Sequence, residues 1–264
     1  MKKIRKIMEI IVMVYVFAIA MGSSLPAEAS TKLATPKVTV AKTSSNSVAI
    51  KWKKIGSAKK YYIYCSENGE KYKRIATTTD KIYIHNKLEL GAKYSYKVKA
   101  INGKKSSNYS RAKSITTDNE GYLLDLIQPY DKSSSYKDFS NDSFEMAGDY
   151  YSHGFTCSGN NGTTYFNLHG DYSTLSFYVG TVNPGNAKEC KVNIYIDNKL
   201  ADSFVIGSHD IPIKKEIDVK NGQKLAITTV SDTTVFCGIF GFGEVKLKLR
   251  SEEHTSELQS HLNL

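Results

Sequence analysis

The sequence predicts an all-β protein built from two antiparallel β-sandwiches. Apolar and polar residues alternate in short runs along most of the chain, which is the pattern of strands that bury one face. Turn-forming pairs such as Asn68-Gly69, Asn102-Gly103 and Asp197-Asn198 separate these runs. No segment has a convincing helical period, so we expect strands throughout.

Residues 1–29 have the features of a secretory signal peptide. A basic start precedes an apolar run at residues 10–21, and small residues fit a cleavage site after Ala29. The apolar run is too short to span a bilayer comfortably, so we expect cleavage and no stable membrane insertion afterwards. These features predict a secreted, extracellular protein, with association to a cell wall as one option.

Residues 250–264 differ in character from the strand pattern before them. They resemble the conceptual translation of a sequencing adapter, and we treat them as a non-native tail. An ordinary polar C-terminus is the alternative, and it leaves the fold unchanged. A natural protein that continues past Leu249 into a catalytic domain also stays open.

Charge divides the remaining chain into two segments. Residues 31–118 contain 20 Lys and Arg against 5 Asp and Glu, a net charge of +15, whereas residues 119–249 contain 11 against 16, a net charge of −5. We expect the domain linker at residues 118–121, where the sign changes. A basic extracellular domain attracts polyanions, including cell-wall polymers, although a merely solvated surface explains the same count.

Four cysteines are few for a secreted chain. Cys65 is alone in the first segment, so a complete set of intradomain disulfides is excluded. We expect mostly small buried residues, with one bridge among Cys157, Cys190 and Cys237 as an alternative. No spacing of Cys or His suggests zinc.

The first segment reads as a small sandwich in which Trp52 belongs to one strand and Tyr62 and Tyr64 bury one face of the next. Residues 88–100 place Leu and Gly before a Tyr-x-Tyr-x-Val-x-Ala run. With Trp52 on the second strand, residues 34–118 resemble a fibronectin type III domain, which is an immunoglobulin-like fold. The resemblance implies that Tyr94 forms a tyrosine corner, with its hydroxyl returning to the backbone. It also implies a spacer that holds another module.

The second segment, residues 121–249, contains the apolar alternation of a second sandwich. Residues 122–127 are expected to form an edge strand. Residues 165–180 predict a hairpin that turns at residues 169–171, with Phe166 and Leu168 buried on one strand and the side chains of Leu175, Phe177 and Val179 buried on the next.

Residues 146–148, 165–172, 192–200 and 217–219 resemble, in order and spacing, the motifs of the NPCBM family. This resemblance implies a jelly-roll-like sandwich of the galactose-binding type that binds carbohydrate. Sugars need flat apolar rings and groups that bond hydroxyls, which tyrosine, histidine, asparagine and aspartate supply. The candidate carbohydrate-binding residues are Tyr150, Tyr151, His153, Asn167, Asp171, Tyr172 and Tyr178. As an alternative, each tyrosine is a half-buried strand residue and Asn167 bonds the turn backbone.

Catalysis has no signature in the sequence. The motifs of zinc proteases, serine hydrolases, Walker loops and dinucleotide folds are absent. Ser152 and His153 are adjacent on a predicted strand and should point to opposite faces, which does not suit a nucleophile and its base. We expect no enzyme, no catalytic or metal-binding residue, no nucleic-acid partner and no cofactor, although calcium is compatible with sandwiches of this type.

The sequence thus predicts a secreted, noncatalytic carbohydrate-binding protein with a fibronectin type III spacer and weak affinity for glycan or cell-wall polymer. Two alternatives remain. One is a structural or adhesive cell-wall protein without a sugar site, and the other is a set of accessory modules of a truncated glycoside hydrolase. The glycan and the oligomeric state have no signature in the sequence.

Overall fold

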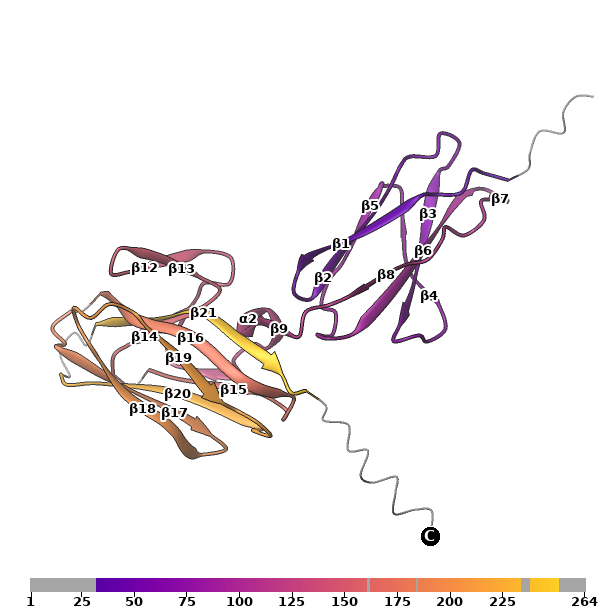
Figure 1. Ribbon diagram of the computed structural model, residues 1–264. Helices are drawn as coiled ribbons and strands as arrows, with labels where there is room; N and C mark the ends of the chain where they lie inside the picture. The colour runs from indigo at the N-terminus through magenta and orange to yellow at the C-terminus, as the bar shows by residue number, and fades with distance from the viewer. Residues whose placement is uncertain (1–31, 161, 184, 234–237, 252–264) are drawn as a thin grey trace, which may run out of the picture.

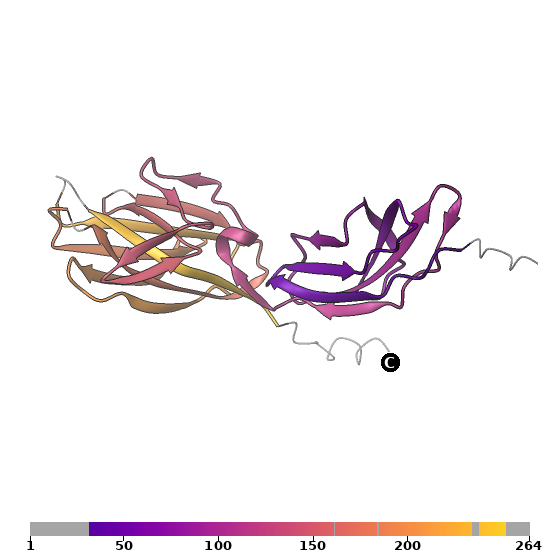
Figure 2. The ribbon, with the colours of Figure 1, turned by 90° about the horizontal axis from the view of Figure 1, so that it is seen from above.

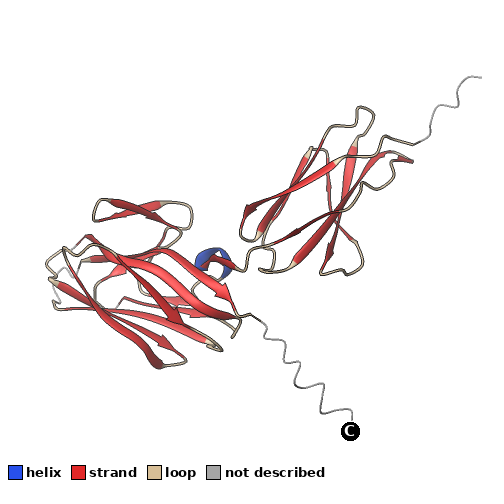
Figure 3. Ribbon diagram, viewed as in Figure 1, coloured by secondary structure: helices blue, strands red, loops and turns tan. Residues whose placement is uncertain are grey.

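Two β-sandwiches lie end to end along the chain (Figures 1 and 2), and a short helix of the described residues lies near their junction (Figure 3). The computed structural model describes residues 32–160, 162–183, 185–233 and 238–251. The predicted signal peptide and residues 252–264 of the predicted tail lie outside the described residues. The strand content and the antiparallel sheets confirm the predicted all-β fold class.

The first sandwich has two antiparallel sheets. One has the strand order β1-β2-β5, and the other has the order β4-β3-β6-β7, with β8 also paired to β6. The strands are β1 (Val38–Ser44), β2 (Ser47–Trp52), β3 (Lys60–Glu67), β4 (Lys73–Thr78), β5 (Ile82–His85), β6 (Lys93–Asn102), β7 (Lys105–Ser106) and β8 (Lys113–Thr116).

The predicted tyrosine corner is confirmed. Tyr94 is buried, and its hydroxyl accepts a hydrogen bond from the backbone N–H of Glu89 at 3.1 Å. The same hydroxyl donates to a carboxylate oxygen of Glu67 at 2.7 Å. Trp52 is buried as predicted, with its ring packed edge-on against Tyr61 at a centroid distance of 5.2 Å. These contacts close the core between the two sheets.

The predicted orientation of β3 is wrong. Tyr61, Ile63 and Cys65 face the core, whereas Tyr62 and Tyr64 point outward and stay half-exposed. Five consecutive residues of this strand are apolar or aromatic, so the sequence offers no polar position that marks the solvent face. A shift by one residue exchanges the two faces of a strand, and the core packing decides which shift occurs.

The second sandwich also has two main sheets. One has the order β10-β15-β20-β17-β18, and the other has the order β11-β14-β21-β16-β19, with β9 paired to β21. A separate hairpin pairs β12 with β13. The strands are β9 (Glu120–Tyr122), β10 (Asp131–Lys132), β11 (Lys137–Asp138), β12 (Ser143–Met146), β13 (Asp149–Ser152), β14 (Phe155–Ser158), β15 (Gly162–Asn167), β16 (Tyr172–Asn183), β17 (Glu189–Ile196), β18 (Lys199–Gly207), β19 (Ile213–Asp218), β20 (Lys224–Ser231) and β21 (Ile239–Leu249).

The chain crosses from one sheet to the other between β15 and β16, and this corrects the predicted hairpin. β15 pairs with β20 in one sheet, while β16 pairs with β19 and β21 in the other, so β15 and β16 lie in opposite sheets of the sandwich. Phe166 and Leu175 are buried as predicted. Period-two burial identifies the inner face of a strand but not its partner, because strands on opposite layers of one sandwich have the same pattern.

The predicted edge strand at residues 122–127 is only partly correct. β9 ends at Tyr122, and Leu123–Leu126 form the helix α2. Leu123 and Leu124 are buried in the core of the second sandwich. One turn of helix brings neighbouring leucines into the same core, which an extended strand with alternating faces would not do.

Backbone hydrogen bonds connect the start of the linker to the first sandwich. The N–H of Asp118 donates to the carbonyl of Ser45 at 3.1 Å, and the N–H of Gly91 donates to the carbonyl of Asp118 at 2.7 Å. The carboxylate of Asp118 also forms an ion pair with Lys42. Gly121 has room for no side chain, since a Cβ there would lie 2.9 Å from the Ser45 hydroxyl oxygen. The linker is therefore attached to the first sandwich.

The cysteines that the structure describes are buried. Cys65 and Cys157 are free thiols, and Cys190 is also buried. Burial raises the pKa of the Cys157 thiol to about 12 and that of Cys65 to about 11. Cys237, the remaining member of the alternative disulfide, lies outside the described residues.

Candidate functional site

A hairpin made of β12 and β13 lies on the outer face of the sheet that contains β21 and β16 (Figure 1). Its residues Phe144 and Met146 form a small core with Phe139, separate from the main core. The strand beneath contributes Gly241 and Gly243, where an added Cβ would lie 2.3 Å from the Phe144 ring and 2.5 Å from the Cβ of Tyr151. Glycine at these positions therefore lets the hairpin pack directly on the sheet.

Two of the candidate tyrosines meet under this hairpin. The rings of Tyr151 on β13 and Tyr178 on β16 have a centroid distance of 5.5 Å, and Tyr151 also packs against Phe144. Burial raises the pKa of Tyr151. Tyr150 points to the opposite side of β13 and is 72% exposed. The structure thus forms an aromatic pair from Tyr151 and Tyr178, with Tyr150 beside it in solvent.

Glu244 on β21 connects the hairpin, the junction and the sheet. Its carboxylate accepts hydrogen bonds from the backbone N–H of Ser152 at 3.2 Å, the Ser152 hydroxyl at 2.9 Å and the Tyr122 hydroxyl at 2.9 Å. Burial and this carboxylate raise the pKa of Tyr122 to about 12. Glu244 has φ of 51°, a left-handed conformation that is costly for glutamate.

His153 has a left-handed backbone as well, with φ of 48°. This conformation breaks the strand alternation, so the Ser152 hydroxyl and Nδ1 of His153 lie 2.8 Å apart instead of on opposite faces as predicted. The His153 ring stacks on Tyr122 at a centroid distance of 3.8 Å. Glu244 accepts hydrogen bonds from the serine and not from the histidine. In a nucleophilic triad the carboxylate bonds the histidine, so this cluster does not have the order of a triad. The cluster connects β13 to β9 and β21.

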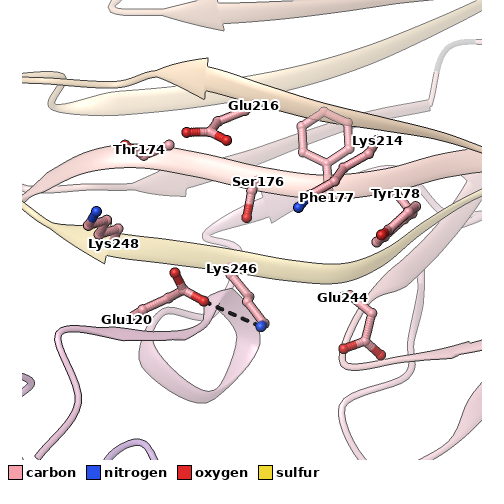
Figure 4. Close-up of a pocket in the computed structure, with 10 residues that line it drawn as sticks. All are labelled: Glu120, Thr174, Ser176, Phe177, Tyr178, Lys214, Glu216, Glu244, Lys246 and Lys248. Atoms are coloured by element: carbon pink, nitrogen blue, oxygen red, sulfur yellow. Dashed lines mark ion pairs between the residues drawn. The ribbon is translucent and has the colours of Figure 1, made fainter.

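A polar groove of about 430 Å³ extends along the outer face of β9, β21, β16 and β19 beside this cluster. In Figure 4, Tyr178 and Glu244 lie at one end, and Thr174 and Lys248 lie at the other. Outward positions of neighbouring strands supply the groove residues, whereas Phe177 points into the core. The groove is lined by Glu120, Thr174, Ser176, Phe177, Tyr178, Lys214, Glu216, Glu244, Lys246 and Lys248.

The charges of the groove are mixed and balanced, with three lysines and three glutamates. Lys246 and Glu120 form an ion pair at 3.3 Å. Ammonium groups donate hydrogen bonds, carboxylates accept them, and the hydroxyls of Ser176 and Tyr178 do both. The groove can therefore bond many hydroxyl groups of a ligand at once, and Tyr178 offers an aromatic ring at one end.

The other three candidate residues lie elsewhere. Asn167 and Asp171 are exposed near the crossing from β15 to β16, where the Asn167 side-chain oxygen accepts the N–H of His169 at 3.2 Å. Asn167 therefore bonds the turn backbone, which is the alternative to sugar binding that was predicted for this residue from the sequence. Tyr172 is half-buried and packs against the main core, and burial raises its pKa. A bulge lies between residues 172 and 174, so Tyr172 does not share the outer face with Tyr178.

Sequence reasoning missed most of the groove. Glu244, Lys246 and Lys248 alternate on β21, and Lys214 and Glu216 alternate on β19, but such residues are typical of any solvated strand face. The alternation in the sequence indicates that these side chains point outward. It does not indicate that β16 pairs with both β19 and β21, which is what brings the side chains into one groove.

Within the described residues, no group of three His, Cys, Asp or Glu side chains is placed to hold a metal ion. Nor does the described part of the chain contain a helix long and apolar enough to cross a membrane.

Similar solved structures include the CBM51-2 and INT domains of ZmpB from Clostridium perfringens, with 16% identity and a TM-score of 0.45 over 66% of this chain and 41% of that chain. The chain thus spans less than half of the ZmpB structure. CBM51 from Clostridium perfringens GH95 in complex with methyl-galactose has 16% identity and a TM-score of 0.43 over 49% of this chain and 99% of that chain. The FN5 domain of Drosophila Lar has 22% identity and a TM-score of 0.29 over 33% of this chain and 97% of that chain.

No curated protein matches the chain. Family models match both parts of it. Residues 42–110 match the PBP1-like, fibronectin3-like domain, and residues 107–235 match the NPCBM/NEW2 domain. The chain therefore has a region that matches a fibronectin3-like domain followed by a region that matches the NPCBM/NEW2 domain, in the order that the sequence resemblance predicts.

Proposed function

We propose that this protein is a noncatalytic carbohydrate-binding protein that works outside the cell, with the polar groove of the NPCBM domain as its glycan site. The observation that carries the proposal is the combination of Tyr178 with a row of lysines and glutamates in one groove. The signal-peptide pattern of residues 1–29 supports an extracellular location.

Sugar recognition needs both parts of this combination. The C–H face of a pyranose ring packs on an aromatic ring, and its hydroxyls take hydrogen bonds from fixed polar groups. The contact with Tyr151 and the hairpin limits the movement of the Tyr178 ring. Neighbouring strands lie about 5 Å apart, so polar groups on β16, β19 and β21 are spaced to bond different hydroxyls of one or two sugar units.

The affinity should be weak. A ring contact of about 1 kcal/mol and several net hydrogen bonds of similar size give roughly 4 to 6 kcal/mol, which corresponds to millimolar to high-micromolar Kd. Such a site suits a targeting module that is linked to other modules or meets a repeated ligand.

Glycan-array screening followed by calorimetry on the best ligand tests the proposal. Glu216→Gln removes an exposed charge of the groove without changing its volume, and Tyr178→Ala removes the ring. We expect both to reduce affinity for the same glycan. Matched controls are Glu189→Gln and Tyr130→Ala, which change exposed residues near the other sheet and should leave binding intact.

Specific glycan binding that neither groove substitution reduces would contradict this site. An array without any ligand would favour the alternative of a structural or adhesive protein. In both cases the fold of each variant is checked by circular dichroism, because Tyr178 also contacts the hairpin.

The proposed role of the first domain is a spacer with a defined orientation. The bonds of Asp118 to Ser45 and Gly91 support this role, since they attach the linker to the first sandwich. We place the domain boundaries at residues 34–118 and 121–249, and propose cleavage after Ala29. Mass spectrometry of the mature protein tests the cleavage site.

A further inference from the structure

The outer face of β4, β3 and β6 in the first domain, which we call the cationic face, presents tyrosines together with basic residues. The reversed orientation of β3 places Tyr62 and Tyr64 on this face. Lys97 lies opposite Tyr64 in the strand register, and Lys99 lies opposite Tyr62. Two further tyrosines join them from adjacent loops, Tyr72 and Tyr109.

Each of three tyrosine rings is covered by a cation. Arg74 lies 4.6 Å and Lys60 5.4 Å from the centre of the Tyr62 ring. Lys97 lies 3.9 Å from the Tyr72 ring, and Lys99 lies 5.1 Å from the Tyr109 ring. A cation over an aromatic ring is held in place by the ring quadrupole, and it keeps its full charge.

This charge is not balanced on the face. The five described strands β3, β4, β6, β7 and β8 contain eight Lys and Arg residues and one acidic residue, Glu67. The carboxylate of Glu67 is bonded to the hydroxyl of the core residue Tyr94. Among the described residues, no ion pair involves Lys60, Arg74, Lys97 or Lys99. Four positive charges are therefore available to an anionic partner.

The arrangement of the rings indicates the kind of polyanion. Tyr64 and Tyr109 meet edge to face at an interplanar angle of 82°, and the cations cover the Tyr62 and Tyr72 rings. Base stacking on single-stranded nucleic acid needs open aromatic faces, and here cations compete for the faces of the Tyr62, Tyr72 and Tyr109 rings. The cationic face offers instead cations interspersed with hydroxyls, including the hydrogen-bonded pair of Tyr72 and Ser95 at 2.7 Å.

We propose that the cationic face binds a linear acidic polysaccharide. Its carboxylates pair with Lys97, Lys99 and Arg74, and its hydroxyls bond the tyrosine and serine hydroxyls between them. This site lies on the first domain and does not depend on the groove proposed for the second. Basic residues two apart on a strand are about 7 Å apart, so they can contact charges repeated along one polymer chain.

The test uses the full chain and polygalacturonate, with fully methyl-esterified polygalacturonate as the uncharged counterpart. The test variant combines Lys97→Glu with Lys99→Glu. The control variant combines Lys51→Glu with Lys53→Glu and therefore changes the net charge by the same amount. The control residues are exposed and flank Trp52 at the end of β2, in the other sheet. We expect the first variant to weaken binding of polygalacturonate at least about tenfold and the control to change it much less.

Three outcomes would overturn the proposal. They are equal weakening by both double variants, equal binding of the esterified polymer, and binding of oligothymidylate in place of polygalacturonate. A milder pair, Lys97→Gln with Lys99→Gln, keeps the test valid if charge reversal disturbs the fold, and Trp52 fluorescence checks this. Tyr178→Ala should leave polygalacturonate binding in place, which separates this site from the groove.

Discussion

Replacement of Glu244 should destabilise the second domain in a way that separates hydrogen bonding from backbone strain. Glu244→Ala removes three hydrogen bonds to a carboxylate, one from Tyr122 and two from Ser152. At about 1 kcal/mol net for each bond, the loss is roughly 3 kcal/mol. Glu244→Gly removes the same bonds but relieves the left-handed φ of 51°, which costs an L-residue about 1 kcal/mol. The glycine variant should therefore be the more stable by about 1 kcal/mol.

The protein contains its own control for this measurement. Trp52 is the single tryptophan and lies in the core of the first domain, so its fluorescence reports urea unfolding of that domain. This transition should not change in either variant. Unfolding of the second domain is followed by tyrosine circular dichroism, and hydrogen exchange of residues 143–152 shows whether the hairpin has loosened.

Two results would refute the reasoning about Glu244. If Glu244→Ala is as stable as the unmodified protein, the three bonds do not hold the hairpin. If the glycine variant is as unstable as the alanine variant, the positive φ stores no strain.

Four further predictions follow from other contacts. Gly243→Ala should destabilise the hairpin by about 1 to 3 kcal/mol because its Cβ would meet Tyr151, and faster hydrogen exchange in β13 would reveal this. Tyr94→Phe should cost the first domain about 1 to 3 kcal/mol in Trp52-monitored unfolding, because the Glu89 N–H loses its acceptor. Cys157, with a pKa raised to about 12, should resist iodoacetamide at pH 8 until the domain unfolds, as peptide mass spectrometry can show. Tyr122 has a pKa raised from 10.0 to about 12, so its contribution to stability is complete below pH 10 and lost as the pH rises through 12; Tyr122→Phe should remove this part of the alkaline stability loss.

The sequence was informative where local pattern determines structure. The resemblance of residues 88–100 to a fibronectin type III domain implied the tyrosine corner at Tyr94, and the structure contains it. The buried faces of β15 and β16 follow from alternation alone. What alternation cannot specify is the partner of each strand, and for that reason the two strands were expected to pair with each other.

The same limit explains which site residues were missed. Tyr151 and Tyr178 are recognisable as aromatic residues, but the glycines that admit the hairpin and the left-handed φ of Glu244 depend on packing between distant strands. Likewise, the outward orientation of Tyr62 depends on which side of β3 faces the core, and an apolar run of five residues does not specify it.

The two proposed surfaces belong to one chain, and the junction determines whether they can act together. A site with millimolar Kd is weak alone, but a polymer that occupies one surface brings its next segment to the other at a high effective concentration. Linkage of this kind raises overall affinity by about 10²-fold or more without any new contact, provided that the geometry allows both sites to be filled. The bonds that attach Asp118 to Ser45 and Gly91 restrict the linker, so the second contact costs less conformational entropy than it would across a flexible tether. A polysaccharide with both neutral and acidic segments would gain most from this arrangement, because the groove balances its charges and the cationic face does not.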